Sequence, residues 1–242
     1  MSKKFIVLDT EGYSTCEPYN IGYIVGDKKG NIYEQRNFAV LPALYENMEY
    51  KYEKKDIKGL QTAHEMLHRN GKEIMYNENE KYIIVHNAEV VYTDLLNLIT
   101  QYNIKRIWAY NCSFDENELF HLFGYEKMTI IKNLVAFCDI IPAILYTRLL
   151  SNEYVEFCKN NNFLTEKGNI RTKAETVYRF LTGNLGFNEE HTALADCLIE
   201  FQILLSAMRE SKNLHRSPCQ AWKILQKFCE NEGIYIPALD DK

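Results

Sequence analysis

The apolar segment near the start of the chain constrains the fold most. Phe5–Leu8 is a continuous run of strand-forming residues, and it leads directly into Asp9 and Glu11. Such a run is typical of a central strand that is buried on both faces of a sheet. Side chains two residues apart on a strand point to the same face, so Asp9 and Glu11 are expected to project together. They would lie at the carboxyl end of the strand, where open α/β sheets bind ligands.

The segments that follow predict an α/β sheet with mixed strand pairing. Tyr19–Gly26 and Ile32–Leu41 are strand-like, and the polar linker between them favours a hairpin. Strands that are followed by alternating helices and strands indicate an α/β fold. The further elements that we expect are a short strand at Tyr82–His86, a helix at Tyr92–Tyr102, a strand at Ile104–Tyr110, a helix at Phe114–Phe123 ended by Gly124, an apolar β-branched stretch at Met128–Ile141, a long apolar helix at Thr192–Met208 and a last helical segment at residues 218–230.

The 242 residues predict one domain. Its core is expected at about 1–210, with a charged, largely helical insertion at about 43–80 after the third strand. A helical extension is expected at about 211–242. We find no internal repeat and no interdomain linker in the sequence.

Charge and cysteine content bear on the partners and the compartment. The net charge is −5, which argues against a protein that holds duplex nucleic acid mainly by electrostatic attraction. A carboxylate-rich site remains compatible with this charge, because bound metal ions reverse it locally. The seven cysteines show no CxxC spacing, which favours free thiols in a reducing compartment. The first apolar run is too short for a signal peptide, and no segment has transmembrane length, so we expect a cytoplasmic protein.

Two further motifs contain carboxylates that are candidates for the same site. Asp115 follows the strand expected at Ile104–Tyr110, where Ser113 and Glu116 form an S-x-x-E pattern that predicts a helix cap. Asp196 lies early in an almost entirely apolar helix, where an aspartate without a partner would be costly.

The three motifs together resemble a known family. Asp9-x-Glu11, then Asn111-x-x-Phe114-Asp115, then His191-x4-Asp196, is similar to the DEDDh 3′→5′ exonucleases, which include proofreading and RNA-trimming enzymes. The resemblance spans residues 5 to about 208. It implies an RNase H-like mixed five-stranded sheet flanked by helices.

The resemblance also implies the chemistry. Two divalent cations, Mg²⁺ or Mn²⁺, would be bound by Asp9, Glu11, Asp115 and Asp196. His191 would take the proton from the attacking water and, with Glu11, would be catalytic. Thr10, Gly12, Asn111 and Phe114 would contact the substrate. This would be DNA or RNA with a free 3′ end, expected as a single strand, and the product would be a nucleoside 5′-monophosphate.

The sequence departs from the family after Glu11. The family continues with Thr-Thr-Gly, whereas this chain has Gly12-Tyr13-Ser14, so the pocket for the terminal nucleotide is expected to differ. Lys167, Arg171 and Lys173 precede the last motif and are candidates for guiding the substrate.

Two alternatives stay open. His64-Glu65-x-x-His68 matches the zinc metalloprotease motif, in which two histidines bind zinc and the glutamate is the general base. The long metzincin form of this motif needs a histidine where Ile74 stands. The other alternative is a non-catalytic RNase H-like module that binds nucleic acid, because a fold alone does not imply activity.

Overall fold

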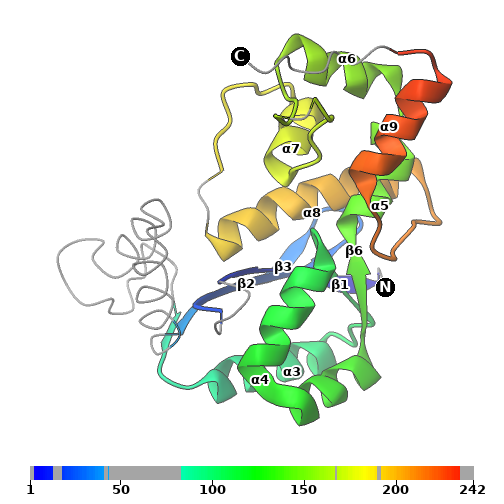
Figure 1. Cartoon of the computed structure of the whole chain (residues 1–242). Coiled ribbons are helices and arrows are strands. Elements are labelled where there is room, and N and C mark those ends of the chain that lie inside the picture. Colours follow the sequence, from blue (N-terminus) through cyan, green and yellow to red (C-terminus); the bar gives the residue numbers. More distant parts are fainter. Residues whose placement is uncertain are drawn as a thin grey trace.

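A six-stranded mixed sheet forms the centre of the protein in the computed structural model, which describes residues 3–12, 18–40, 43, 83–166, 168–189 and 192–234. The strand order is β4-β3-β2-β1-β5-β6. Figure 1 shows the sheet between two groups of helices. The strands are β1 (Lys4–Glu11), β2 (Asn20–Asp27), β3 (Ile32–Val40), β4 (Ile83–Val85), β5 (Arg106–Ala109) and β6 (Ala136–Asp139).

Strand pairing confirms the predicted α/β fold with a mixed sheet. β1, β2 and β3 form antiparallel pairs, and β5 and β6 run parallel to β1. The five strands in the order β3-β2-β1-β5-β6 are consistent with an RNase H-like arrangement. The short strand predicted at Tyr82–His86 is β4, which pairs in parallel with β3 and makes a sixth strand at the edge.

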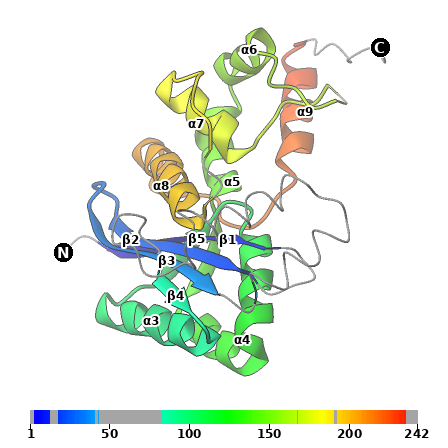
Figure 2. The same cartoon turned by 90° about the vertical axis from the view of Figure 1, so that its left-hand side faces the viewer.

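The helices cover both faces of the sheet. α3 and α4 lie against one face, and α8 crosses the other, as Figures 1 and 2 show. The helices are α3 (Ala88–Gln101), α4 (Cys112–Leu134), α5 (Ile140–Ile144), the π-helix η1 (Leu145–Leu149), α6 (Asn152–Asn160), α7 (Ala174–Thr182), α8 (Ala193–Glu210) and α9 (Ala221–Asn231). Among the helices of these described ranges, none is long and apolar enough to cross a membrane.

Alternate residues of β1 supply the two hydrophobic cores. Ile6 and Leu8 belong to the core beneath α3 and α4. Phe5 and Val7 belong to the core beneath α8, which also includes α5, α6 and α9. The uninterrupted apolar run in the sequence therefore reflects a strand that is buried on both faces.

The start of α4 corrects one prediction. The Ser113/Glu116 capping box does not form, because the helix already begins at Cys112 and Ser113 lies inside it. Asn111 is the N-cap residue, in the left-handed region with φ 64°, which asparagine tolerates better than most residues. Glu116 forms an ion pair with Lys132 instead.

The end of the predicted Phe114–Phe123 helix also differs. Gly124 has non-helical angles, as expected of a residue that breaks the helix. Helical structure nevertheless resumes and continues to Leu134, so the stretch predicted from Met128 is helical in its first half and contains β6 in its second. Apart from Ala43, the insertion predicted at residues 43–80 lies outside the described residues.

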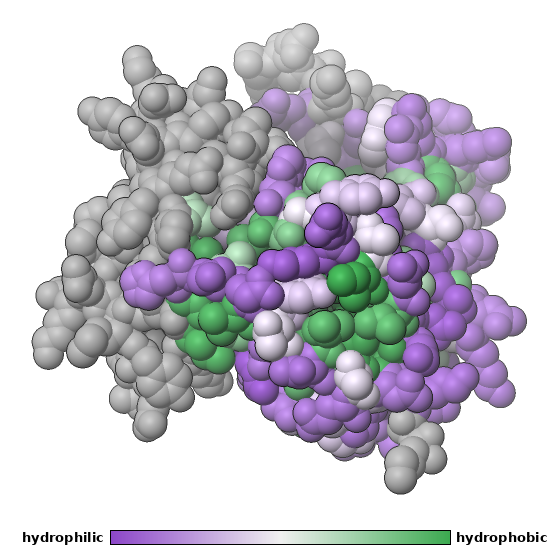
Figure 3. Space-filling model, turned by 90° about the horizontal axis from the view of Figure 1, so that it is seen from below, coloured by the Kyte–Doolittle hydropathy of each residue, from purple (hydrophilic) through white to green (hydrophobic). Residues whose placement is uncertain are grey.

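The outer surface of α3 and α4 carries several exposed apolar side chains. Figure 3 views the molecule from this side and shows hydrophobic residues in green next to hydrophilic residues in purple. The exposed large apolar side chains of α3 and α4 are Val90, Phe120, Tyr125, Ile130 and Leu134.

Two glycines of β2 allow α8 to lie very close to the sheet. A Cβ atom on Gly22 would lie well under 3.0 Å from backbone atoms of Ala193 and Leu194. A Cβ atom on Gly26 would similarly collide with the ring of Phe201. The beginning of α8 is therefore packed backbone to backbone on β2, which only glycine permits at that distance.

This contact predicts that Gly22→Ala destabilises the protein by about 1–3 kcal/mol, the usual cost of overpacking. The atoms that the new methyl group meets belong to backbone, so they cannot move aside as a flexible side chain would. Urea denaturation of the purified variant measures the change.

Gly186→Ala is the matched control. A Cβ atom there has its nearest neighbour at 3.7 Å, so the free energy of unfolding should stay equal or rise slightly. Equal stability of the two variants would contradict the close packing of α8 on β2.

Candidate active site

The side chains of the last residues of β1 point alternately to the two faces of the sheet. Because side chains alternate along the strand, Asp9 and Glu11 continue the face that lies beneath α8, whereas Thr10 continues the face that lies beneath α4. Asp9 and Glu11 therefore lie on the same face of the sheet, as the sequence predicts.

The seating of α8 brings Asp196 to these carboxylates. Asp9 is the register partner of Gly22, the residue on which α8 begins. The backbone N–H of Ala193 donates a hydrogen bond to Asn20 Oδ1 at 2.9 Å, which fixes the helix to the end of β2. Asp196 lies one turn further along α8, so its side chain faces the carboxyl end of β1.

Three of the four predicted metal-binding carboxylates meet. Ligand oxygens of Asp9, Glu11 and Asp196 all lie within 4.8 Å of one another. Asp9 Oδ2 is buried and has no hydrogen-bond partner in the part of the chain that the structure describes. These features fit a hard divalent cation, which carboxylate oxygens bind and which would neutralise their repulsion.

The electrostatics of Asp9 are consistent with this fit. Burial raises the pKa of Asp9 well above its usual value, and the negative charges of Glu200, Asp115, Glu11 and Asp196 raise it further. A cation among these groups would lower their pKa values and so favour the charged carboxylates.

The fourth predicted carboxylate lies beside the cluster and has other partners. Asp115 is buried in the first turn of α4, and its Oδ1 accepts hydrogen bonds from Thr10 N at 3.0 Å and Thr10 Oγ1 at 2.9 Å. It reaches the edge of β1 from the α4 face, opposite to the face of Asp9. Burial raises the pKa of Asp115, and the Thr10 hydrogen bonds act against this rise.

Sequence reasoning missed a further carboxylate, Glu200. It is buried on α8 one turn after Asp196, and its Oε2 accepts a hydrogen bond from Tyr110 N at 3.2 Å. Burial and the charges of Asp115 and Asp196 raise its pKa well above the usual value. The helical spacing of four residues from Asp196 is the signal that could have identified it.

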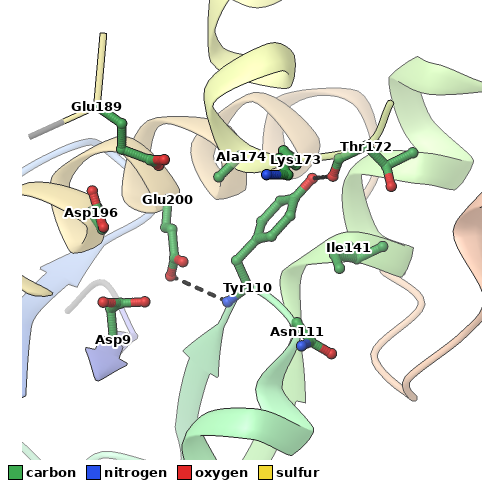
Figure 4. Close-up of a pocket in the computed structure, with 10 residues that line it drawn as sticks. All are labelled: Asp9, Tyr110, Asn111, Ile141, Thr172, Lys173, Ala174, Glu189, Asp196 and Glu200. Carbon is green, nitrogen blue, oxygen red and sulfur yellow. Dashed lines mark hydrogen bonds between the residues drawn. The ribbon is translucent and has the colours of Figure 1, made fainter. Parts of the chain in front are cut away.

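A pocket of about 390 Å³ opens beside these groups, between α8, the end of β5 and the start of α7. Figure 4 shows Glu200 pointing between Asp9 and the backbone of Tyr110, with Lys173 across the pocket. Among the described residues that line the pocket, Lys173 is the only cationic one. The lining residues are Asp9, Tyr110, Asn111, Ile141, Thr172, Lys173, Ala174, Glu189, Asp196 and Glu200.

The other predicted site residues are distributed differently. Asn111 lines the pocket, as a substrate contact would, but Thr10, Gly12 and Phe114 are not among its lining residues. Thr10 instead holds Asp115. His191 lies outside the described residues, as does the complete His64-Glu65-x-x-His68 motif.

A second unpredicted carboxylate lies next to Gly12. Glu118 of α4 is fully buried, and neither of its oxygens has a hydrogen-bond partner within the described ranges. Glu118 Oε2 occupies the space that a Cβ atom on Gly12 would take. Loss of hydration raises the pKa of Glu118 to about 7.

A scan against models of protein families finds no match, and a search of curated proteins finds no similar sequence. The function is therefore inferred from the geometry and chemistry of the site.

Glu118 predicts a pH-dependent effect on stability. Burial raises its pKa from the usual 4.5 to about 7, so the folded protein retains the proton over a range where the unfolded chain has lost it. The Glu118 contribution to the free energy of unfolding should therefore fall as pH rises between these values and stay low above them. Glu118→Gln cannot ionise, so its stability relative to the native protein should increase over that range.

Urea denaturation of both proteins in EDTA, at several pH values from about 4 to 8, measures this difference. A difference in unfolding free energy that does not change with pH would contradict the burial of an ionisable, unpartnered Glu118.

Proposed function

We propose that the protein is a metal-dependent 3′→5′ exonuclease that releases nucleoside 5′-monophosphates from DNA or RNA. The observation that carries the proposal is the convergence of Asp9, Glu11 and Asp196 from β1 and α8 at the carboxyl edge of the sheet. The donors are all carboxylate oxygens, which suit Mg²⁺ or Mn²⁺ better than softer metals.

The four carboxylates have different proposed roles in cation binding. Asp9, Glu11 and Asp196 would hold one cation directly, and Asp115 would complete the proposed pair of ions from the other side of β1. Two such ions would supply Lewis-acid chemistry there, which favours deprotonation of the attacking water and stabilises negative charge on the leaving oxygen. Thr10 fixes the orientation of Asp115 through two hydrogen bonds, so Asp115 needs little reorganisation on binding.

The neighbouring pocket has the charge pattern that a phosphodiester needs once cations are present. Lys173 faces the acidic wall formed by Asp196, Glu189 and Glu200, and its ammonium group would contact a phosphate oxygen. Asn111 at the opposite rim offers an amide that can donate to or accept from a nucleotide. We propose that His191, which precedes the N-cap residue Thr192 of α8 in the sequence, takes the proton from the attacking water.

The proposed substrate is a strand with a free 3′ end, accepted as single-stranded nucleic acid. A cytoplasmic location is part of the proposal, and it fits the free thiols of Cys112, Cys138, Cys158, Cys197, Cys219 and Cys229. The zinc metalloprotease alternative depends on residues 64–68, which lie outside the described part of the chain. Asp196 and Glu200 are both buried, and the repulsion between their carboxylates lowers stability. A module that only binds nucleic acid has no need of such a pair, so this feature favours a metal-dependent enzyme.

We expect Asp9→Asn and Asp196→Asn each to reduce 3′→5′ exonuclease activity by at least about a hundredfold, because each removes a charged ligand of the cation. The assay follows 5′-labelled DNA and RNA oligonucleotides in Mn²⁺, with EDTA as the metal-free reference. Isothermal titration of Mn²⁺ into the same variants measures whether cation binding is lost in parallel.

Glu126→Gln is the matched control for the loss of one carboxylate. Glu126 is exposed on α4, far along the helix from Asp115, so its variant should keep both activity and Mn²⁺ binding. Unchanged nucleotide release by folded Asp9→Asn or Asp196→Asn would rule out the proposed role of this site.

His191→Ala tests the proposed general base. The variant should lose most of its turnover while retaining Mn²⁺ binding, since general-base catalysis contributes about 10²–10⁴-fold. A kcat close to that of the native protein would remove His191 from the mechanism but would leave the carboxylate site in place.

A further inference from the structure

Tyr110 spans the pocket from its acidic wall to the segment that precedes α7. It directly follows β5, and its backbone N–H donates a hydrogen bond to Glu200 Oε2 at 3.2 Å. At the other end of the side chain, its hydroxyl donates a hydrogen bond to the backbone carbonyl of Thr172. Figure 4 shows the ring between these two bonds, with Lys173 next to Thr172. Tyr110 therefore connects a carboxylate of α8 with the segment that carries Lys173.

The segment before α7 is fixed at two consecutive carbonyl groups. Tyr154, which is buried on α6, donates from its hydroxyl to Arg171 O at 2.6 Å, directly before the Thr172 carbonyl that Tyr110 binds. Both hydroxyls keep their proton, because burial raises the pKa of each tyrosine well above its usual value. The backbone that leads to Lys173 is therefore held by residues of two different elements, although the Lys173 side chain is exposed.

The ammonium group of Lys173 is available to a ligand of the pocket. Lys173 is the N-cap residue of α7 and the only cationic residue among the described ones that line the pocket. It forms no ion pair with any residue of the described ranges, although Glu189, Asp196 and Glu200 belong to the same lining. A lysine has a long and flexible stem, so the place of its charge depends on where its backbone is held.

The charges along the pocket indicate the class of ligand. Asp9, Asp196 and Glu200 lie on the side where the proposed cations would bind, and Lys173 lies across the pocket from them. A phosphate group between the two sides would meet positive charge on both, from the cations and from the ammonium group. A nucleoside without a phosphate would leave the Lys173 charge without a partner.

We propose that Tyr110 is a positioning residue that holds Lys173 toward the cation centre, and that Lys173 makes binding depend on a phosphate group of the ligand. Tyr110 acts through the Thr172 backbone, whereas Lys173 contacts a phosphate oxygen directly. This inference rests on the proposed exonuclease function for the identity of the ligand.

Steady-state hydrolysis of a 5′-labelled oligonucleotide in Mn²⁺ tests both residues. Lys173→Met keeps an unbranched side chain and removes its charge. It should raise KM by roughly tenfold or more, as expected for the loss of a hydrogen bond between charged groups. The kcat should stay nearly unchanged, because the contact is made before the transition state as well as in it. Tyr110→Phe removes only the hydroxyl and should raise KM by a smaller factor.

The double variant distinguishes a positioning role from a general loss of stability. Once Lys173→Met is present, Tyr110→Phe should have little further effect on KM, because both residues act through one contact. A KM that does not rise in Lys173→Met overturns the inference. It is also overturned if Tyr110→Phe leaves KM unchanged, or raises it by the same factor whether or not Lys173 is present.

Tyr23→Phe is the matched control. Tyr23 is also buried, and its hydroxyl donates to Asp94 Oδ2 at 2.6 Å on the face of the sheet beneath α3 and α4. This variant loses a comparable hydrogen bond away from the pocket, so its KM should equal that of the native protein. Thermal unfolding checks that each variant is folded. A rise in KM as large as that of Tyr110→Phe would contradict the positioning role.

A binding measurement is independent of catalysis. Isothermal titration in Mn²⁺ compares adenosine 5′-monophosphate with adenosine, which lacks the phosphate. The native protein should bind the monophosphate more tightly, and this difference should shrink in Lys173→Met and Tyr110→Phe but not in Tyr23→Phe. If no oligonucleotide is degraded but this dependence is seen, the exonuclease proposal fails and the roles of Tyr110 and Lys173 stand. Degradation and monophosphate binding that are equal in all variants support the exonuclease and overturn the inference.

Discussion

The first turn of α8 lies directly on Gly22 of β2, and the geometry of the candidate site depends on this contact. Gly22 is the register partner of Asp9, so any shift of the helix start changes the distance between Asp9 and Asp196. Asn20 strengthens the contact by accepting a hydrogen bond from Ala193, and it also donates to Asn37 and to the Phe38 carbonyl. Two distant parts of the chain thus meet through backbone packing, which is less adaptable than contact between side chains.

The site concentrates negative charge that folding alone would not favour. Asp115, Asp196 and Glu200 are buried close together, and burial raises the pKa of Asp115 and Glu200. Each such group lowers stability at neutral pH unless a cation or a hydrogen-bond donor compensates. Asp139 is an example of a buried carboxylate that a hydrogen-bond donor compensates. It caps α5 by accepting a hydrogen bond from Ile141 N. Burial nevertheless raises its pKa to about 6.

Much of the fold could be predicted because the pattern of apolar residues is strong. The run Phe5–Leu8 predicts a central strand, and alternation along it predicts the shared direction of Asp9 and Glu11. The position of Asp196 on an apolar helix was also predictable. These features depend on local periodicity, which the sequence contains in full.

Features set by contacts between distant segments could not be predicted in this way. The side of β1 from which Asp115 approaches depends on how α4 packs, and so does the contact of Glu118 with Gly12. The helix start at Cys112 depends on the left-handed conformation of Asn111, which overrides the Ser113 capping pattern. Glu200 is an intermediate case, because its spacing from Asp196 is visible but its hydrogen bond to Tyr110 is not.

The most direct test of the central claim is a crystal structure of the native protein with Mn²⁺, with anomalous diffraction used to locate the metal. A bound cation is expected between the carboxylates of Asp9, Glu11 and Asp196, at oxygen distances of about 2–2.3 Å. A crystal in which Mn²⁺ is absent from this place, or bound only elsewhere, would contradict the account of these carboxylates as a metal centre.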